Sequence, residues 1–277
     1  MNAFAQLTGK RVFITGAASG IGYELALAFA SQGASIVAAD ISEQGLKQLM
    51  QEMESAGRHC RTLLLDVTDE ESFDNLFSAM AECDELPDIV VNNAGIGFLG
   101  GFLQTDTSIW RRILEINVLG VANGCRAYLR ARPDSTTPGL LVNVASAASI
   151  APMPNMSAYA ASKYAVEAMS EVLAMELGDS SVDVMCVHPG VINTPIVNDP
   201  NMSRVSAGQL KRLQVYYTEN GNTPALVARQ VVAGVKSGRG TVFAGDSVGV
   251  TAFLKRLLSR RSFRRLLAGK AREIGYL

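Results

Sequence analysis

The sequence predicts an α/β fold in which a doubly wound parallel sheet of about seven strands carries helices on both faces. Short apolar runs of about five residues recur along the whole chain, and helical patterns lie between them. Such continuous apolar runs are typical of strands that are buried on both faces. No shift in composition and no internal repeat divides the 277 residues, so we expect a single domain over residues 1–277.

The first half of the chain predicts strands and helices in strict alternation. The first strand, Arg11-Val-Phe-Ile-Thr15, is rich in β-branched and aromatic residues and ends at glycines that begin the first helix. The same succession of an apolar run, a turn and a helical pattern then repeats. The predicted strands are 11–15, 34–39, 61–65 and 87–91, and the predicted helices are 22–32, 43–56 and 70–81.

The second half continues the alternation with longer helices. The predicted helices are 109–130, 159–177 and 225–236, and the predicted strands are 139–144, 182–187 and 240–244. Residues 192–223 show no regular period and are longer than most connections, so we expect an irregular segment of the kind that forms a lid over a ligand site.

The composition indicates an aliphatic core and excludes several classes of protein. Hydrophobic residues make up 48% of the chain and aromatic residues 6%, but no apolar stretch approaches the ~18 residues that span a bilayer. The first ten residues lack the pattern of a secretory signal, which favours a cytoplasmic location. Without a Cys-x-x-Cys spacing we expect buried free thiols at Cys60, Cys83, Cys125 and Cys186. The two histidines, His59 and His188, are too isolated to predict a metal site.

A glycine-rich turn lies where the first strand meets the first helix. In Thr15-Gly-Ala-Ala-Ser-Gly-Ile-Gly22, Gly16, Gly20 and Gly22 allow the backbone to pass close to a pyrophosphate, which the helix N-terminus attracts. The spacing is Gly-x-x-x-Gly-x-Gly rather than the common Gly-x-Gly-x-x-Gly. Without further context, the turn could equally be a tight connection between strand and helix.

Asp40 ends the second predicted strand, eighteen residues after Gly22, where a carboxylate can accept hydrogen bonds from the hydroxyls of an adenosine ribose. A carboxylate there would repel a 2′-phosphate, and no Lys or Arg lies in the glycine turn or next to Asp40. The sequence therefore favours NAD over NADP. The alternative is that Asp40 is an anion at the N-terminus of the following helix or a turn residue before Ser42. Asp66 and Val67 follow the third strand and could border the adenine, although Asp66 suits a helix start equally well.

Tyr159 and Lys163 lie four residues apart in a predicted helix, so their side chains share one face. A neighbouring ammonium favours the phenolate and would lower the pKa of Tyr159 from its usual value near ~10. The phenol could then act as a general acid and base. The pair alone is weak evidence, because Tyr-x-x-x-Lys also arises by chance on half-buried helix faces.

Several motifs, in this order along nearly the whole chain, resemble the short-chain dehydrogenase/reductase (SDR) family. Thr15–Gly22 resembles its glycine turn, and Asn92-Asn-Ala-Gly95 is similar to the segment that follows its fourth strand. Asn117, Ser146, Tyr159 and Lys163 match its catalytic residues, and Ser146 lies thirteen residues before Tyr159, the usual spacing. Pro189-Gly190 with Thr194 resembles the segment that contacts the nicotinamide.

The resemblance implies a single NAD-binding Rossmann domain and an NAD(P)-dependent oxidoreductase that acts on CH–OH groups. Ser146 would orient the substrate oxygen, Tyr159 would take its proton as hydride leaves for the nicotinamide, and Lys163 would lower the pKa of the tyrosine. Asn117 would hold a water that links Lys163 to solvent. The implied NAD-binding residues are Gly16, Ser19, Gly20, Ile21, Gly22, Asp40, Asp66, Val67, Asn93, Ala94, Gly95, Tyr159, Lys163, Pro189, Gly190, Val191, Ile192 and Thr194.

The segments expected around the substrate are apolar. Residues 147–156 and the substrate lid at 192–223 offer Met, Pro, aliphatic and Tyr side chains. They suit a hydrophobic secondary alcohol or ketone that is steroid-like, alicyclic or long-chain, although they could also pack on one another. A 3-oxoacyl thioester reductase is the alternative within the family. A non-catalytic dinucleotide-sensing or scaffold protein is the alternative from another class, and the intact catalytic set argues against it.

The extension at 254–277 is strongly basic. Residues 255–272 contain eight basic side chains and no acidic one, so the rest of the chain carries a net charge of −9. Its apolar positions are out of phase for one helix, so we expect two short helices broken near 259–262, with Ser262 as a candidate N-cap. The segment could cover the substrate entrance, contact another subunit or bind a membrane surface. The acidic remainder opposes binding of nucleic acid.

The resemblance also implies a homotetramer or homodimer. We expect its subunits to meet through the helices at 109–130 and 159–177.

Overall fold

The computed structural model describes residues 2–132, 136–193 and 203–277, and in these residues seven parallel strands form one sheet. Its order is β3-β2-β1-β4-β5-β6-β7, so the chain moves outward from β1 to β3 and then returns to the other side of β1. The predicted doubly wound α/β fold is confirmed. The strands are β1 Arg11–Thr15, β2 Ser35–Asp40, β3 Cys60–Leu64, β4 Ile89–Asn92, β5 Gly139–Val144, β6 Val182–Pro189 and β7 Thr241–Ala244.

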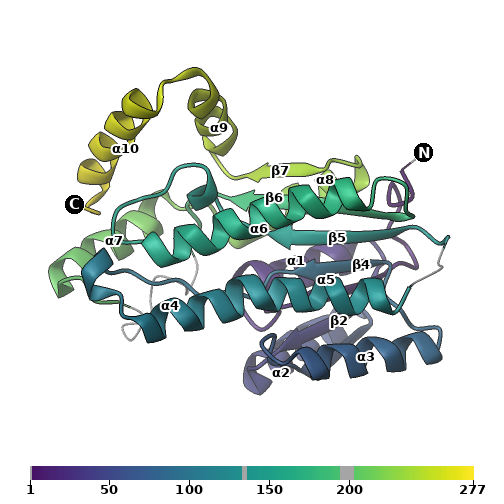
Figure 1. Cartoon of the computed structure of the whole chain (residues 1–277). Coiled ribbons are helices and arrows are strands. Elements are labelled where there is room, and N and C mark those ends of the chain that lie inside the picture. Colours follow the sequence, from purple (N-terminus) through teal and green to yellow (C-terminus); the bar gives the residue numbers. More distant parts are fainter. Residues whose placement is uncertain (1, 133–135, 194–202) are drawn as a thin grey trace.

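Helices cover both faces of this sheet (Figure 1). One face carries α1 Gly20–Ser31, α2 Glu43–Ser55 and α8 Pro224–Lys236. The other carries α3 Glu70–Glu82, α5 Gly120–Arg130 and α6 Ser157–Glu176, and α4 Thr107–Leu114 leads into α5. Apart from the long helix discussed below, the bounds of these elements lie within two residues of the predicted ones.

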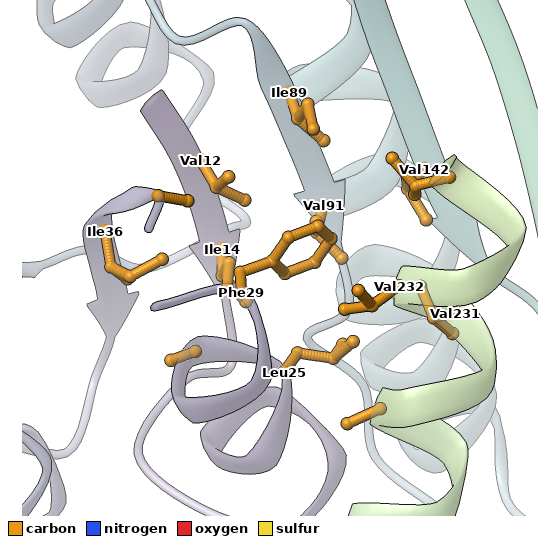
Figure 2. Packing of buried hydrophobic residues seen from close by; sticks show 14 of the residues in the cluster. Val12, Ile14, Leu25, Phe29, Ile36, Ile89, Val91, Val142, Val231 and Val232 are labelled. Carbon is orange, nitrogen blue, oxygen red and sulfur yellow. The ribbon is translucent and has the colours of Figure 1, made fainter. Parts of the chain in front are cut away.

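The sheet has a hydrophobic core on each face, and alternate side chains of its strands point into one core or the other. Val12 and Ile14 of β1 point to the core under α1 and α8, whereas Phe13 packs against α3 and α5 on the other face. Figure 2 shows Leu25 and Phe29 of α1 directed at the strands from one side of the first core. Each such side chain stabilises the fold by about 1.5–3 kcal/mol when it is fully buried. The packing therefore holds the strand ends, which carry the candidate site residues, in a fixed order.

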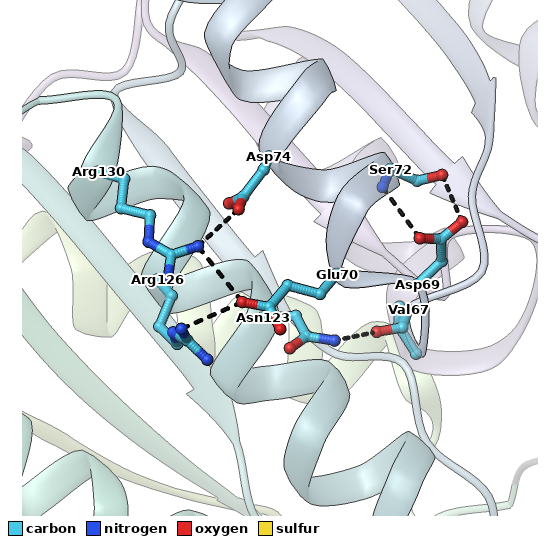
Figure 3. A network of polar contacts seen from close by, with 8 residues as sticks. All are labelled: Val67, Asp69, Glu70, Ser72, Asp74, Asn123, Arg126 and Arg130. Atoms are coloured by element: carbon cyan, nitrogen blue, oxygen red, sulfur yellow. Dashed lines mark hydrogen bonds and ion pairs between the residues drawn. The ribbon is translucent and has the colours of Figure 1, made fainter.

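Polar contacts join α3 to α5 (Figure 3). Glu70 accepts from Arg126 at 3.1 Å and from Arg130 at 3.3 Å. These side chains are about half exposed, so each pair contributes only ~0–1 kcal/mol. The buried amide of Asn123 donates to the Val67 carbonyl at 3.0 Å and fixes the backbone that follows β3.

Two segments differ from the prediction. The long helix expected over 109–130 is interrupted by a π-helical turn, Glu115–Leu119, between α4 and α5. The irregular lid expected over 192–223 is partly wrong, because Ala207–Asn220 form helix α7. The apolar residues Leu210, Leu213 and Tyr217 have the helical spacing i, i+3 and i+7, and the Ser206 hydroxyl caps the helix by accepting from Gln209 N at 3.2 Å.

The basic extension forms two helices, α9 Val248–Leu257 and α10 Arg260–Ile274, which confirms the predicted break. The N-cap of α10 is Ser259 rather than Ser262, because the Ser259 hydroxyl accepts from Ser262 N at 3.2 Å. In Figure 1 the two helices stand away from the layers, and α10 runs back towards α7. Within the described ranges, no helix is long and apolar enough to cross a membrane.

The expectation of four buried thiols holds for two of them. Cys125 and Cys186 are buried in the core. Cys83 is exposed because it ends α3 at the surface, and Cys60 is half-buried because it opens β3 at the edge of the sheet.

Candidate active site

A cavity of about 820 Å³ lies along the carboxyl ends of the strands, where the strand order reverses. In doubly wound folds this is the place where ligands bind. The cavity brings together most of the residues that the sequence analysis selected: Gly16, Ser19, Gly20, Ile21, Asp40, Asp66, Val67, Asn93, Ala94, Gly95, Ser146, Tyr159, Lys163, Pro189, Gly190, Val191 and Ile192. Gly22 and Asn117 are not among the lining residues, and Thr194 lies outside the described residues.

The glycine turn has a backbone that only glycine adopts easily. Gly16 and Gly20 have φ of +66° and +57°. A Cβ on Gly22 would lie 2.1 Å from the Gly16 carbonyl oxygen, so Gly22 is needed for the close packing of the turn itself. The Asn93 amide donates to Thr15 O at 2.9 Å and holds the turn against the end of β4.

The N-terminus of α1 fits an anionic group of a dinucleotide. Ser19 is its N-cap residue, but the serine side chain makes no capping hydrogen bond to the helix. Ser19, Gly20 and Ile21 line the cavity, so the first N–H groups of this twelve-residue helix lie beside it. Uncapped N–H groups and the positive end of a helix favour a pyrophosphate.

The carboxylate of Asp40 is fixed at the end of β2, on the edge of the cavity. Its two oxygens accept from Ala18 N at 3.0 Å and from Ser42 N at 2.9 Å. Asp40 does form a turn before Ser42, as the structural alternative expected, but the N-cap of α2 is the Ser42 hydroxyl, which accepts from Gly45 N. Each Asp40 oxygen keeps a lone pair for a further donor.

Asp66 likewise does not begin a helix. Its Oδ1 accepts from the backbone and the hydroxyl of Thr68 at 2.9 and 2.8 Å, whereas Asp69 caps α3. Asp66 and Val67 therefore form a turn that borders the cavity beyond β3.

Tyr159, Lys163 and Ser146 converge from two elements. Tyr159 and Lys163 lie in the first two turns of α6, and Lys163 Nζ is 5.9 Å from the centre of the Tyr159 ring. Lys163 Nζ donates to Val144 O, the last residue of β5, at 2.8 Å. Ser146 follows that strand and hydrogen-bonds with the Tyr159 side chain. The arrangement places a hydroxyl, a phenol and an ammonium at one end of the cavity.

Burial controls the protonation of this group. Desolvation raises the pKa of Tyr159 to about 12, and the hydrogen bond with Ser146 opposes the rise. Desolvation also lowers the pKa of Lys163 to about 8. The expectation that Lys163 lowers the pKa of Tyr159 is therefore wrong for this state of the site. Burial outweighs the ammonium, which is directed at Val144 O.

Asn117 lies in the π-helical turn and ties two parts of the site together. Its side chain accepts from Ile96 N at 2.8 Å and donates to Ile96 O at 2.9 Å. It also donates to the Ser162 hydroxyl at 3.0 Å, which in turn donates to Tyr159 O. These bonds position the backbone of Tyr159, and the predicted relay through a water at Asn117 stays a prediction.

The sequence analysis missed a buried hydrogen-bond chain behind Ser146. The Ser149 hydroxyl donates to Ser146 O at 2.7 Å and lies 3.1 Å from His188 Nδ1. Because that hydroxyl has one proton, His188 Nδ1 must be the donor. Lys255 of α9 donates to Ser149 O at 3.2 Å. His188 looked isolated because Ser149, its hydrogen-bond partner, lies far from it along the chain, in the turn that follows β5.

A second missed group lies beside Tyr159, at the same end of the cavity. The hydroxyls of Tyr217 in α7 and Tyr276 after α10 are 2.6 Å apart. Asn155 and Gln209 donate to Tyr276 O at 2.7 and 3.0 Å. Burial raises the pKa of both tyrosines. Tyr217 was expected in the lid, whereas nothing in the sequence marked Tyr276. The neighbouring cavity wall is apolar: Ile150, Met153, Met156, Leu254, Leu266, Leu267 and Ile274.

Comparison with known proteins gives a family match over most of the chain. The short chain dehydrogenase family model matches residues 10–204. "Probable oxidoreductase EphD" of Mycobacterium tuberculosis is 44% identical over 186 residues, which are 67% of this chain. Those residues are 31% of that protein, so this chain spans about a third of the length of the curated relatives it matches first. "3beta-hydroxysteroid dehydrogenase 1" of Eggerthella lenta is 34% identical over 194 residues, which are 70% of this chain and 74% of that protein.

Solved structures show the same architecture. A short chain dehydrogenase/reductase from Burkholderia phymatum, in complex with NAD, superposes with a TM-score of 0.82 at 26% identity. The match covers 90% of this chain and 93% of that one.

Proposed function

Because the chain belongs to the short-chain dehydrogenase/reductase family, we propose that it is an NAD-dependent oxidoreductase that interconverts a hydrophobic secondary alcohol and its ketone. One observation carries the proposal. Ser146, Tyr159 and Lys163 line one end of a cavity whose other end is formed by the glycine turn and Asp40. A bound nicotinamide dinucleotide would supply the hydride acceptor or donor.

The chain's own residues move and hold the proton in this proposal. In ketone reduction, the Tyr159 hydroxyl donates its proton to the substrate oxygen and becomes a phenolate, and in alcohol oxidation the phenolate takes the proton back. Ser146 donates to the same oxygen and orients it. A pKa of about 12 keeps Tyr159 protonated at neutral pH, which suits the donor role. As the phenolate forms, the Lys163 ammonium stabilises it, and its N–H groups not used by Val144 O can bind ribose hydroxyls.

The preference for NAD over NADP rests on Asp40. Its carboxylate is held at the cavity edge by two backbone N–H groups and keeps lone pairs for ribose hydroxyls. Among the described residues that line this end of the cavity, at 16–21, 40–41 and 65–67, none is lysine or arginine. A 2′-phosphate would meet an uncompensated negative charge there.

The hydrophobic substrate class rests on the cavity wall near Tyr159. Met153, Met156, Leu254 and Leu267 form an apolar surface around the reacting end. The similarity to a protein described as a 3β-hydroxysteroid dehydrogenase agrees with a bulky alicyclic substrate. A 3-oxoacyl thioester reductase is the second candidate, and a preference for NAD argues against it.

The decisive experiment is an assay of reduced nicotinamide by absorbance. The chain is mixed with NAD or NADP and with a panel of hydrophobic secondary alcohols, and small polyols serve as the control substrates. We expect turnover of the hydrophobic alcohols with NAD. A preference for polyols would contradict the substrate class, and a preference for NADP would contradict the cofactor. Dinucleotide binding without turnover of any alcohol or ketone would favour the non-catalytic alternative.

A further inference from the structure

The outer face of α9 carries a row of exposed apolar side chains. Val250, Phe253 and Leu257 have the spacing i, i+3 and i+7, so they share one side of the helix. Their exposed fractions are 63, 60 and 65%. Single exposed apolar residues are common, but such a row on one helix face marks a surface that meets an apolar partner.

The outer face of α10 carries arginines. Arg261, Arg265 and Arg272 have the spacing i, i+4 and i+11, which places them on one side, away from the buried Phe263 and Ala271. All three arginines are exposed. Residues 255–272 contain eight basic side chains and no acidic one, so the segment as a whole is strongly positive.

The inner faces of the same helices belong to the cavity. Thr251 and Leu254 of α9 and Leu266 and Leu267 of α10 line it. Lys255 is anchored inward, because it donates to Ser149 O at 3.2 Å and to the Tyr164 hydroxyl at 3.0 Å. A helix is about 10–12 Å thick, so the apolar outer row lies that close to the apolar end of the cavity.

We propose that the outer face of α9 and α10 binds the surface of a membrane that contains anionic lipids. Val250, Phe253 and Leu257 enter the boundary between headgroups and acyl chains, and the arginines of α10 contact lipid phosphates. The apolar side chains suit the acyl-chain region of an anionic membrane, and the arginines suit its phosphate region. No carboxylate lies between residues 255 and 272 to oppose the anionic lipids. A hydrophobic molecule could then pass from the lipid to the cavity with little exposure to water.

The test measures binding alone, so its result does not depend on the proposed oxidoreductase activity. The whole 277-residue chain is sedimented with vesicles of phosphatidylcholine and with vesicles of phosphatidylcholine and phosphatidylglycerol, at low and high salt. We expect binding to the mixed vesicles that high salt weakens. Each basic residue near the surface contributes about a 5-fold gain, so Arg261→Gln with Arg265→Gln should weaken binding about 25-fold. Phe253→Ser should weaken it about 10-fold.

Matched variants elsewhere on the surface serve as controls. Lys47→Gln with Arg239→Gln removes two exposed charges, and Leu64→Ser removes an apolar side chain that is 62% exposed. Both should bind the mixed vesicles as the unchanged chain does. Equal binding to neutral and mixed vesicles would overturn the proposal, as would equal losses in test and control variants. A lower molecular mass of the Phe253→Ser variant in solution would also overturn it, because a second copy of the chain would then cover this face.

Discussion

Tyr159 is the residue on which the proposed chemistry depends most directly. We expect Tyr159→Phe to lower kcat by about 10³-fold, within the ~10²–10⁴-fold that a positioned acid or base contributes. Dinucleotide affinity should change little, because the phenol acts on the substrate oxygen. Steady-state kinetics and equilibrium binding check the two expectations. Tyr164→Phe on the same helix is the control, since its hydroxyl contacts Lys255 rather than the reacting group. A near-normal kcat for Tyr159→Phe would refute the assignment.

Lys163 predicts a pH dependence of stability with a definite sign. Its pKa is about 8 in the fold and ~10.4 in an unfolded chain, so between these values the unfolded chain binds more protons. Stability contributed by this group therefore rises with pH across that window, by up to about 1.4 kcal/mol per pH unit. Below pH 8 the buried ammonium is charged in both states, and its desolvation cost is fully present.

Urea denaturation of the wild type and Lys163→Met between pH 7 and 10 measures this effect. Burial raises the pKa of Cys125 and Cys186 to about 12, so these thiols lower stability at high pH in both proteins. The difference in unfolding free energy between the wild type and the variant therefore isolates the effect of Lys163. We expect the unfolding free energy of the wild type, relative to that of the variant, to increase as pH rises from about 8 to 10. Parallel curves would show that Lys163 titrates normally.

At the residue scale, the sequence could identify reactive groups but not their surroundings. The order of several motifs along the chain selected Ser146, Tyr159 and Lys163, and all three line the cavity. The sign of the pKa shift of Tyr159 was missed, because it depends on how deeply the folded chain buries this side chain, which local spacing does not show. His188 was missed for the same reason, since its hydrogen bond to Ser149 spans thirty-nine residues.

Among the elements, the π-helical turn at Glu115–Leu119 has the clearest expected phenotype. Asn117→Ala leaves the N–H and C=O groups of Ile96 and the hydroxyl of Ser162 without this partner. A buried polar group without a partner costs about 1–3 kcal/mol, so we expect a loss of about 2–5 kcal/mol in unfolding free energy. The value of kcat should fall as well, because Ser162 bonds to the backbone of Tyr159.

Thermal denaturation and steady-state kinetics of Asn117→Ala test this expectation. Asn123→Ala is the control on the neighbouring helix, because it removes one hydrogen bond, to Val67 O, at a distance from Tyr159. It should lose less stability and keep kcat. If the two variants behaved alike, Asn117 would have no special link to the reacting group.

The elements themselves could be predicted well where packing on both faces imposes apolar runs. The bounds of β1 and β5 were predicted to the residue, because Lys10 and Gly16 flank β1 and Pro138 precedes β5. The π-helical turn could not be seen, since its composition does not differ from that of an α-helix. Helix α7 was overlooked because only Leu213 in it is fully buried, which leaves a weak periodic signal.

For the whole molecule, we predict a homodimer or homotetramer formed through the helices α4–α5 and α6. Val172 and Met175 of α6 are 48 and 73% exposed, and Leu119 before α5 is 55% exposed. Exposed apolar side chains on neighbouring helices suit a subunit interface. Light scattering should show a multimer for the wild type and a smaller species for Val172→Arg. Leu64→Arg, on the edge strand β3, is the exposed control. A wild-type monomer would refute the prediction.

The order of strands also governs how the molecule can assemble while it is being synthesised. Among the strands that the structure describes, only the pair β1–β4 joins strands that are not consecutive in the chain. A nascent chain that has emerged as far as Asn92 can therefore already pair β1 to β4, and it contains the glycine turn and Asp40. Tyr159 comes sixty-seven residues later. Until β5 emerges, the edge of β4 is open to strands of other chains, so the ribosome-bound intermediate is the stage most exposed to aggregation.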